Sequence, residues 1–373
     1  MSLPPFDSQY FSDLLCDLLA IPSPSGYTDR VVHRVGEELQ RLGIPFELTR
    51  RGAIHARMEG REAHPERAMA AHLDTLGGMV TKLKDNGRLR LSPIGTWSSR
   101  FAEGARVSVI TDDQVLRGTV LPLKASGHIY NEEVDQQPVN WDQVELRLDA
   151  WSKSKADLQA LGVQPGDFVT FDSVPEFVNG FINSRHLDDK VGVACLLSVA
   201  RDFVQFGVQP AVHTNLFFTI FEEVGSGASS ILHPEISEMV ALDNATNAPE
   251  SASSEDGVTI AMGDMTGPFD YHLTHKLVAL AQEHGIRHSR DVFRHYRCDV
   301  ASAVEAGFDI RTGLLCFAVD ASHGYERTHL DSVAALHQLV AAYLQSPPTF
   351  ARDCTQVGPL AGFPQQPMIH SRR

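Results

Sequence analysis

The stretch Asn215-Leu-Phe-Phe-Thr-Ile-Phe-Glu-Glu-Val-Gly225 decides the fold that this sequence predicts. Its apolar part, Asn215–Phe221, is typical of a buried β-strand, and the pair Glu222-Glu223 follows directly. Two like charges at the end of a buried strand are unfavourable without nearby cations, because desolvation raises their pKa values or destabilises the fold. An open α/β sheet places its chemistry beyond the carboxyl ends of its strands. The stretch therefore predicts an α/β sheet with a cation site at one edge.

Polar residues also end other apolar segments on both sides of this stretch. In His72-Leu-Asp74 the two polar residues lie two apart, so in a strand they point to the same side and the carboxylate can orient the imidazole. Two imidazoles and several carboxylates are what a pair of divalent metals needs when the site must stay open to water. Besides the glutamate pair, the series contains His72, Asp74, Asp188, Asp189, Asp243 and His323.

Each member of this series also has a simpler interpretation. A His-x-Asp pair can occur by chance, and Asp188-Asp189 can be capping residues at a helix N-terminus. Strand ends commonly carry aspartate, and His329 and His337 compete with His323. Chance pairs, caps and surface acids have no reason to occur together at successive strand ends. The joint order therefore indicates a two-metal hydrolase.

A change in the spacing of strand-like segments along the chain predicts an insertion in the α/β pattern. The 373 residues are enough for two domains, or for one domain with an insertion. Closely spaced Val-rich segments between turn signals indicate a small β-barrel or sandwich. The α/β pattern resumes near Phe168. Within it, a helix is expected to begin in Ser226–Leu232. The expected parts are a catalytic domain in two pieces, 1–75 and 168–346, an inserted β domain, 76–167, and a C-terminal tail, 347–373.

Composition limits the partners and the compartment. The formal net charge of −15 argues against nucleic acid or an anionic membrane as a partner. No apolar stretch approaches the roughly 18 to 20 residues of a membrane span, and the N-terminus lacks the pattern of a secretory signal. The five cysteines have no paired spacing, which favours reduced thiols in a cytoplasmic protein.

Together these residues resemble the M42 family of metallo-aminopeptidases, within the clan of dinuclear zinc exopeptidases. The similarity extends to about Leu344 and includes the inserted β domain. It implies an α/β fold in which helices flank a mixed sheet that carries an inserted small β-barrel or sandwich. The matching stretches are Ile21–Gly26, Ala71–Gly77, Leu187–Gly192, Phe221–Gly225, Leu242-Asp243 and Ser322-His323.

The resemblance also implies a role for each site residue. Two divalent ions per subunit, zinc in the first place and cobalt or manganese otherwise, would bind mixed N/O ligands. Glu222 would be the general base, Asp74 would orient His72, and the peptide bond after Asp188 would be cis. Family members tend to form homo-oligomers, from dimers up to dodecamers. The implied metal ligands are His72, Asp188 as the bridge, Glu223, Asp243 and His323.

This sequence departs from the family pattern around the expected substrate site. Asp320 lies in a stretch where relatives usually carry an arginine, and Glu326 is one residue early. Cys298-Asp299 stands where a Thr-Asp pair is common, and Ile94–Phe101 lacks a usual glycine pair. The metal site is complete, whereas the residues expected to contact substrate are unusual.

The leading hypothesis is a hydrolase that removes N-terminal residues from short peptides, with Glu222 moving the proton. A second hypothesis keeps the same chemistry for a small N-acylated or amidated dipeptide-like metabolite. A third is a catalytically silent scaffold, although pseudo-enzymes generally lose a ligand or the base and none is missing here.

Overall fold

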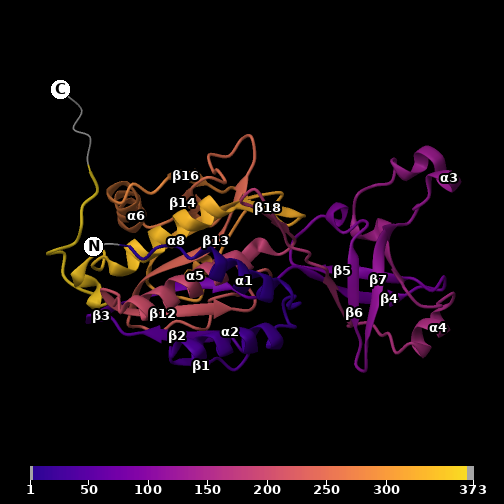
Figure 1. The fold of residues 1–373 in the computed structure, drawn as a ribbon, viewed down its shortest axis with the longest axis horizontal. Helices are drawn as coiled ribbons and strands as arrows, with labels where there is room; N and C mark the ends of the chain where they lie inside the picture. Colours follow the sequence, from indigo (N-terminus) through magenta and orange to yellow (C-terminus); the bar gives the residue numbers. More distant parts are fainter. Residues whose placement is uncertain (1–2, 368–373) are drawn as a thin grey trace.

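A computed structural model describes residues 3–367 of the chain as two lobes that lie side by side (Figure 1). The larger lobe contains a mixed sheet with helices, and the smaller lobe is a closed antiparallel β-barrel. The predicted fold class is therefore confirmed. Within residues 3–367, no helix is both long enough and apolar enough to cross a membrane.

The large sheet contains twelve strands within the described residues. Its main path runs β1-β2-β12-β3-β13-β17-β18-β11-β10, and β14 pairs with β17 outside this path. Neighbouring strands β12, β3, β13 and β17 are all parallel, so their carboxyl ends meet at one edge. The strands are β1 (Phe46–Leu48), β2 (Ile54–Met58), β3 (Glu62–His72), β10 (Glu176–Val178), β11 (Phe181–Ser184), β12 (Val212–Thr219), β13 (Ile236–Asn247), β14 (Val258–Asp264), β15 (Gly267–Pro268), β16 (His288–Val292), β17 (Arg311–Asp320) and β18 (Glu326–His329).

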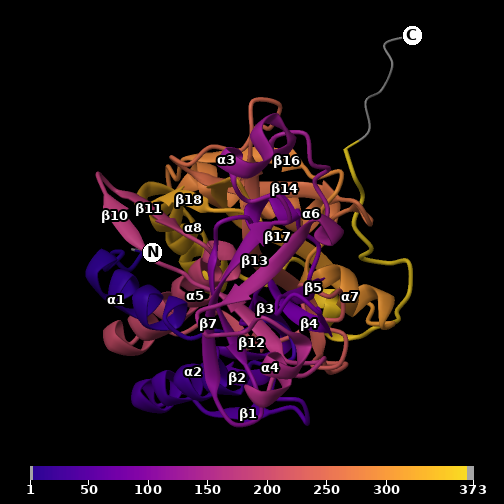
Figure 2. The same cartoon turned by 90° about the vertical axis from the view of Figure 1, so that its right-hand side faces the viewer.

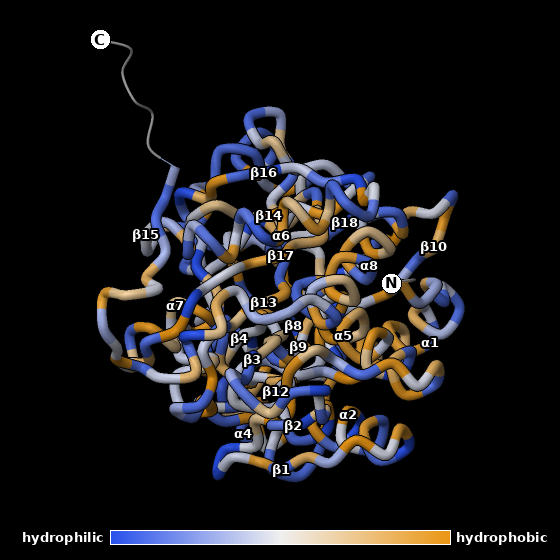
Figure 3. The backbone as a smooth tube through the Cα atoms, turned by 90° about the vertical axis from the view of Figure 1, so that its left-hand side faces the viewer, coloured by the Kyte–Doolittle hydropathy of each residue, from blue (hydrophilic) through white to orange (hydrophobic). Residues whose placement is uncertain are grey.

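Helices cover both sides of these parallel strands. Helix α5 packs against β3 and β13, with α1, α2 and α8 beside it, whereas α7 lies on the other side of the sheet (Figures 2 and 3). Helix α6 contacts α8, β14 and β17. The helices of this lobe are α1 (Ser8–Leu19), α2 (Asp29–Leu42), α5 (Leu187–Phe206), α6 (Tyr271–Glu283), α7 (Asp299–Glu305) and α8 (Leu330–Gln345), with a 3-10 turn at η4 (Ala351–Cys354).

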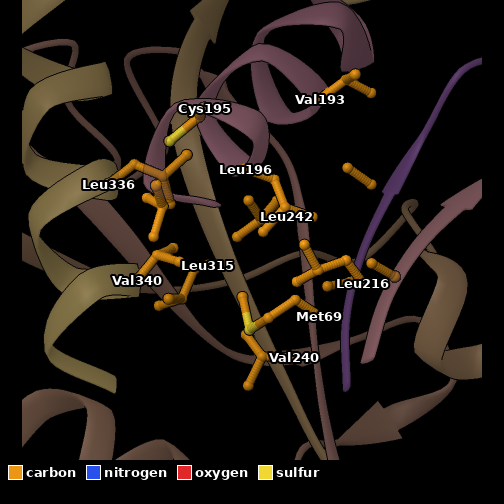
Figure 4. Close-up of a cluster of buried hydrophobic side chains, with 14 of the residues drawn as sticks. Met69, Val193, Cys195, Leu196, Leu216, Val240, Leu242, Leu315, Leu336 and Val340 are labelled. Carbon is orange, nitrogen blue, oxygen red and sulfur yellow. The ribbon is translucent and has the colours of Figure 1, made fainter. Parts of the chain in front are cut away.

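The main hydrophobic core lies between α5, α8 and the central strands. Met69, Leu216, Val240 and Leu315 of the strands lie in one cluster with Leu196 of α5 (Figure 4), and each is fully buried. Burial of apolar surface is the dominant favourable contribution to the free energy of folding. The core therefore fixes the four parallel strands, and with them the positions of the residues at their ends.

The barrel is inserted between β3 and β10. Its strand order is β4-β5-β8-β7-β6-β9 among the described residues, and it has a separate hydrophobic core. Two chain segments join it to the large lobe, directly before β4 and after β9. The elements are β4 (Gly77–Leu83), β5 (Leu89–Ile94), η1 (Ser99–Phe101), β6 (Arg106–Ile110), β7 (Val115–Pro122), α3 (Gly127–Tyr130), η2 (Asn131–Val134), η3 (Trp141–Gln143), β8 (Val144–Leu148), α4 (Lys155–Ala160) and β9 (Phe168–Phe171).

One expected element is absent. Residues 226–232, where the sequence predicts the start of a helix, form a series of turns in the described chain. Here Ser226 and Gly227 both donate their N–H groups to the Phe221 carbonyl, and a side chain at Gly227 would collide with the Asp299 carboxylate. The close approach of α7 therefore leaves no room for a helix, and that prediction is wrong.

Candidate metal centre

The predicted site residues gather where the four parallel strands end. His72 is the last residue of β3, and Asp243 lies inside β13, which continues to Asn247. Glu222 and Glu223 follow β12 in a turn, and His323 follows β17. Because parallel strands end at the same edge of a sheet, residues far apart in the sequence come together there.

The carboxylate of Asp188 lies between the two histidines. Its Oδ1 is 3.0 Å from Nε2 of His72, and its Oδ2 is 3.2 Å from Nε2 of His323. Asp188 comes from the start of α5, where the peptide bond to Asp189 is cis, as the resemblance implied. One carboxylate thus presents a separate oxygen to each imidazole.

Two groups of possible metal ligands share this aspartate. The ligand atoms of His72, Asp188 and Asp243 all lie within 4.8 Å of one another. The same limit holds for the ligand atoms of Asp188, Glu223 and His323. The arrangement can hold two cations bridged by one carboxylate, which is the geometry of two-metal hydrolytic sites.

A backbone carbonyl holds the second nitrogen of each imidazole. Nδ1 of His72 lies 2.8 Å from the carbonyl oxygen of Asp74, whereas the Asp74 carboxylate is 3.7 Å away. Nδ1 of His323 lies 2.8 Å from the carbonyl oxygen of Thr96 in the inserted domain. A proton on Nδ1 leaves Nε2 free to bind a metal, and such contacts fix the ring orientation.

The Asp74 carboxylate instead fixes the glutamate turn. It accepts hydrogen bonds from the backbone N–H groups of Glu222 at 3.1 Å and Glu223 at 3.3 Å. It also accepts a hydrogen bond from Oγ of Ser25 at 2.5 Å. Gly225, at a φ of 86°, lets the chain turn directly afterwards. Asp74 therefore determines where both glutamate side chains begin.

The site contains three contacts that the sequence did not identify. Nδ2 of Asn244 donates to Oδ2 of Asp188 at 2.6 Å. The buried carboxylate of Glu326 accepts the backbone N–H groups of His323 at 2.9 Å and Asp188 at 3.1 Å. The third contact is the Thr96 carbonyl. Asn244 could have been identified from the sequence, because it is a polar residue directly after the predicted ligand Asp243. The Thr96 contact could not, because every residue has a main-chain carbonyl.

The carboxylates of the site repel one another in a buried environment. Burial raises the pKa of Asp243 to about 7, and the charge of Asp188 adds to this effect. Burial likewise raises the pKa of Glu223 to about 8. Oε1 of Glu223 is buried and makes no hydrogen bond within residues 3–367. Divalent cations would neutralise this charge and occupy the free oxygen, so the residues fit a two-metal centre.

A cavity of about 630 Å³ opens directly over the carboxylates. Asp188, Glu222, Glu223 and Asp243 line one part of it. A second part is lined by the segment His295-Tyr296-Arg297, and Thr96 of the inserted domain contributes as well. A volume of this size is typical of a site for a small ligand.

Asp299 and Asp320, two of the residues that depart from the family pattern, lie in different surroundings. Asp299 is buried beneath the glutamate turn, where its Oδ2 accepts a hydrogen bond from Oγ1 of Thr219 at 2.7 Å. Asp320 lies at the surface and forms an ion pair with Arg327 at 3.5 Å. Asp299 therefore supports the site from below, whereas Asp320 faces solvent.

Comparison with known proteins gives a consistent family assignment. The model of the M42 glutamyl aminopeptidase family matches residues 52–339. A relative from Bacillus subtilis, named "Putative aminopeptidase YhfE", is 34% identical over 337 residues, which are 90% of this chain and 97% of the relative.

Two solved structures share the fold. A TET aminopeptidase from a marine sediment Thaumarchaeota archaeon is 16% identical with a TM-score of 0.84, and the match covers 93% of this chain and 99% of that one. The TET1 peptidase of Pyrococcus horikoshii is 24% identical with a TM-score of 0.78, over 90% and 99% of the two chains. At these identities the likeness concerns the fold alone.

Proposed function

The chain belongs to the M42 family of aminopeptidases and is a hydrolase, and on this premise we propose that it removes N-terminal residues from short peptides. The observation that carries the proposal is the Asp188 carboxylate, shared between two histidine-containing ligand groups. Glu222 lies beside these groups, with its Oε2 4.0 Å from Nε2 of His72. The family match gives no support to the alternative of an amidated metabolite.

We assign the metal ligands from the two groups around Asp188. His72 and Asp243 would hold one ion, Glu223 and His323 would hold the other, and Asp188 would bridge them. When bound, two divalent ions polarise the scissile carbonyl and lower the pKa of the attacking water. Mixed nitrogen and oxygen ligands suit zinc, with cobalt or manganese as substitutes.

Glu222 is proposed as the group that moves the proton. Asp74 holds its backbone N–H at 3.1 Å, and its side chain lines the cavity. Glu222 would take a proton from the attacking water and deliver it to the leaving amine. The amide C–N bond breaks, the carbonyl carbon gains a hydroxyl group and the amine nitrogen gains the proton.

The assembly and the compartment are also proposed. The Pyrococcus horikoshii relative is described as assembling into a tetrahedron or a large octahedral shell, and we propose a homo-oligomer for this chain, built from dimers towards a dodecamer. A cytoplasmic location is supported by the cysteines, which are all free thiols within the described residues.

Replacement of the proton carrier tests the proposal. In Glu222→Gln the amide cannot accept a proton, so kcat for a free-amine peptide should fall about 10²-fold to 10⁴-fold. The metal content should remain that of the wild type, because Glu222 is not assigned as a ligand. Glu283→Gln, at the exposed end of α6, is the matched control. A fully metallated Glu222→Gln enzyme with wild-type kcat would refute the assignment.

A further inference from the structure

The cavity over the metal centre contains a cationic side chain that the proposed mechanism does not use. Arg297 lines the same cavity as Glu222, Glu223 and Asp243. Its Nη2 donates to Oε2 of Glu305 at 2.7 Å, and its Nε and Nη1 make no hydrogen bond within residues 3–367. Glu305 is itself 57% exposed, and exposed ion pairs of this kind are weak and exchangeable. The guanidinium can therefore accept another anionic partner.

The charges of the cavity favour a substrate with a carboxylate near Arg297. The four positive charges of two divalent ions would match the four carboxylates that line the cavity. Arg297 then remains as a cation of the cavity lining that the four carboxylates do not need for their own neutralisation. A planar guanidinium with free N–H groups binds a carboxylate with two parallel hydrogen bonds.

The position of Arg297 indicates which part of the substrate carries this group. Arg297 and Glu222 line the same cavity, so both can contact one bound substrate. Because Glu222 would deliver its proton to the leaving amine, a cation that lines the same cavity is available to the leaving residue.

Resting on the proposed aminopeptidase function, we propose that Arg297 binds the free α-carboxylate of the leaving residue, and that dipeptides are the preferred substrates. In a dipeptide this carboxylate lies about 2.5 Å from the leaving nitrogen, through a single Cα. Each further residue moves it away by up to about 3.6 Å. A dipeptide thus places its carboxylate beside the proton carrier, which a longer peptide does not.

Four peptides and three variants test the inference on the metal-loaded protein. Alanyl-alanine should exceed alanyl-alanine amide in kcat/KM by about tenfold to a hundredfold, the range for a hydrogen bond to a charged group. The tripeptide of alanine should resemble the amide. In Arg297→Met the ratio between dipeptide and amide should fall to about one. Arg297→Lys keeps the charge without the planar fork, so its ratio should be intermediate. Arg294→Met, in the same segment but outside the cavity lining, should keep the wild-type ratio.

The outcomes separate the possible errors. Equal hydrolysis of alanyl-alanine and its amide by the wild type would overturn the inference and leave the proposed function intact. Preferred hydrolysis of glutamyl-alanine amide, lost in Arg297→Met, would place the carboxylate on the N-terminal residue and also overturn it. No hydrolysis of any of the four peptides would overturn the proposed function itself, and the inference with it.

Discussion

The inserted barrel supplies one of the two carbonyls that contact the histidines of the proposed metal centre, which makes a testable link between the two lobes. The Thr96 carbonyl reaches His323 from the loop that follows β5. Trp97, the next residue, anchors this loop. Its Nε1 donates to the Gly77 carbonyl at 3.2 Å, and its ring packs at a centroid distance of 4.8 Å against both Trp141 and Phe171.

We expect Trp97→Ala to weaken one metal site selectively. The lost hydrogen bond contributes about 1 kcal/mol, and each aromatic pair adds about 0.5–1.5 kcal/mol. The anchoring of the loop thus amounts to about 2–4 kcal/mol. Loss of a contact that orients a ligating histidine costs about tenfold to a hundredfold in metal affinity, or about 1.4–2.8 kcal/mol. The free energy lost from the loop contacts is therefore large enough to account for loss of the Thr96 contact that orients His323.

The assay is a zinc titration of the metal-free protein in competition with a chelating indicator, fitted to two dissociation constants. One constant should rise about tenfold to a hundredfold, while the other stays near its wild-type value, because the Asp74 carbonyl that orients His72 belongs to the larger lobe. Trp151→Ala, in the same barrel with a side chain 90% exposed, should change neither constant. Equal weakening of both sites, or no change in either, would refute the reasoning.

Two further predictions concern the buried Glu238 carboxylate, which contacts Arg67, Lys276 and the backbone N–H of Thr349. Nη2 of Arg67 lies 2.9 Å from Oε1 of the buried Glu238 carboxylate. Arg67→Met removes this partner, so the free energy of unfolding measured in urea should fall by about 3–5 kcal/mol. A decrease of less than about 1 kcal/mol would contradict this prediction. Although burial raises the pKa of Glu238, the charges of Arg67 and Lys276 lower it overall from 4.5. The stabilisation from Glu238 should therefore be complete above pH 4.5 and be lost as the pH falls below that value. Urea midpoints between pH 3 and 6 should show a shallower decrease in Glu238→Gln, and identical slopes would exclude this cause.

The strand ends could be predicted from the sequence because each carries a local signal. An apolar segment followed by a carboxylate or histidine specifies both the strand and the residue beyond it, as at Glu222 and His323. The parallel neighbours β12, β3, β13 and β17 then place these residues at one edge. The order along the chain was therefore more informative than any single motif.

Other parts of the structure depend on tertiary contacts that leave no such signal. Strand β16 is polar along most of its length and lies at an edge beside β14, so it has no apolar run to mark it. The turns at 226–232 are imposed by the position of Asp299. The Thr96 carbonyl acts through the backbone, which any residue at that position would provide.

Asp188 is proposed to bridge two metal ions that the activity requires. The most direct measurement is the rate of hydrolysis of a free-amine dipeptide as metal-free protein is titrated with zinc. We expect a negligible rate without metal, an increase with added zinc and a plateau at two equivalents per chain. Full activity in the metal-free protein, or a plateau at one equivalent, would contradict it.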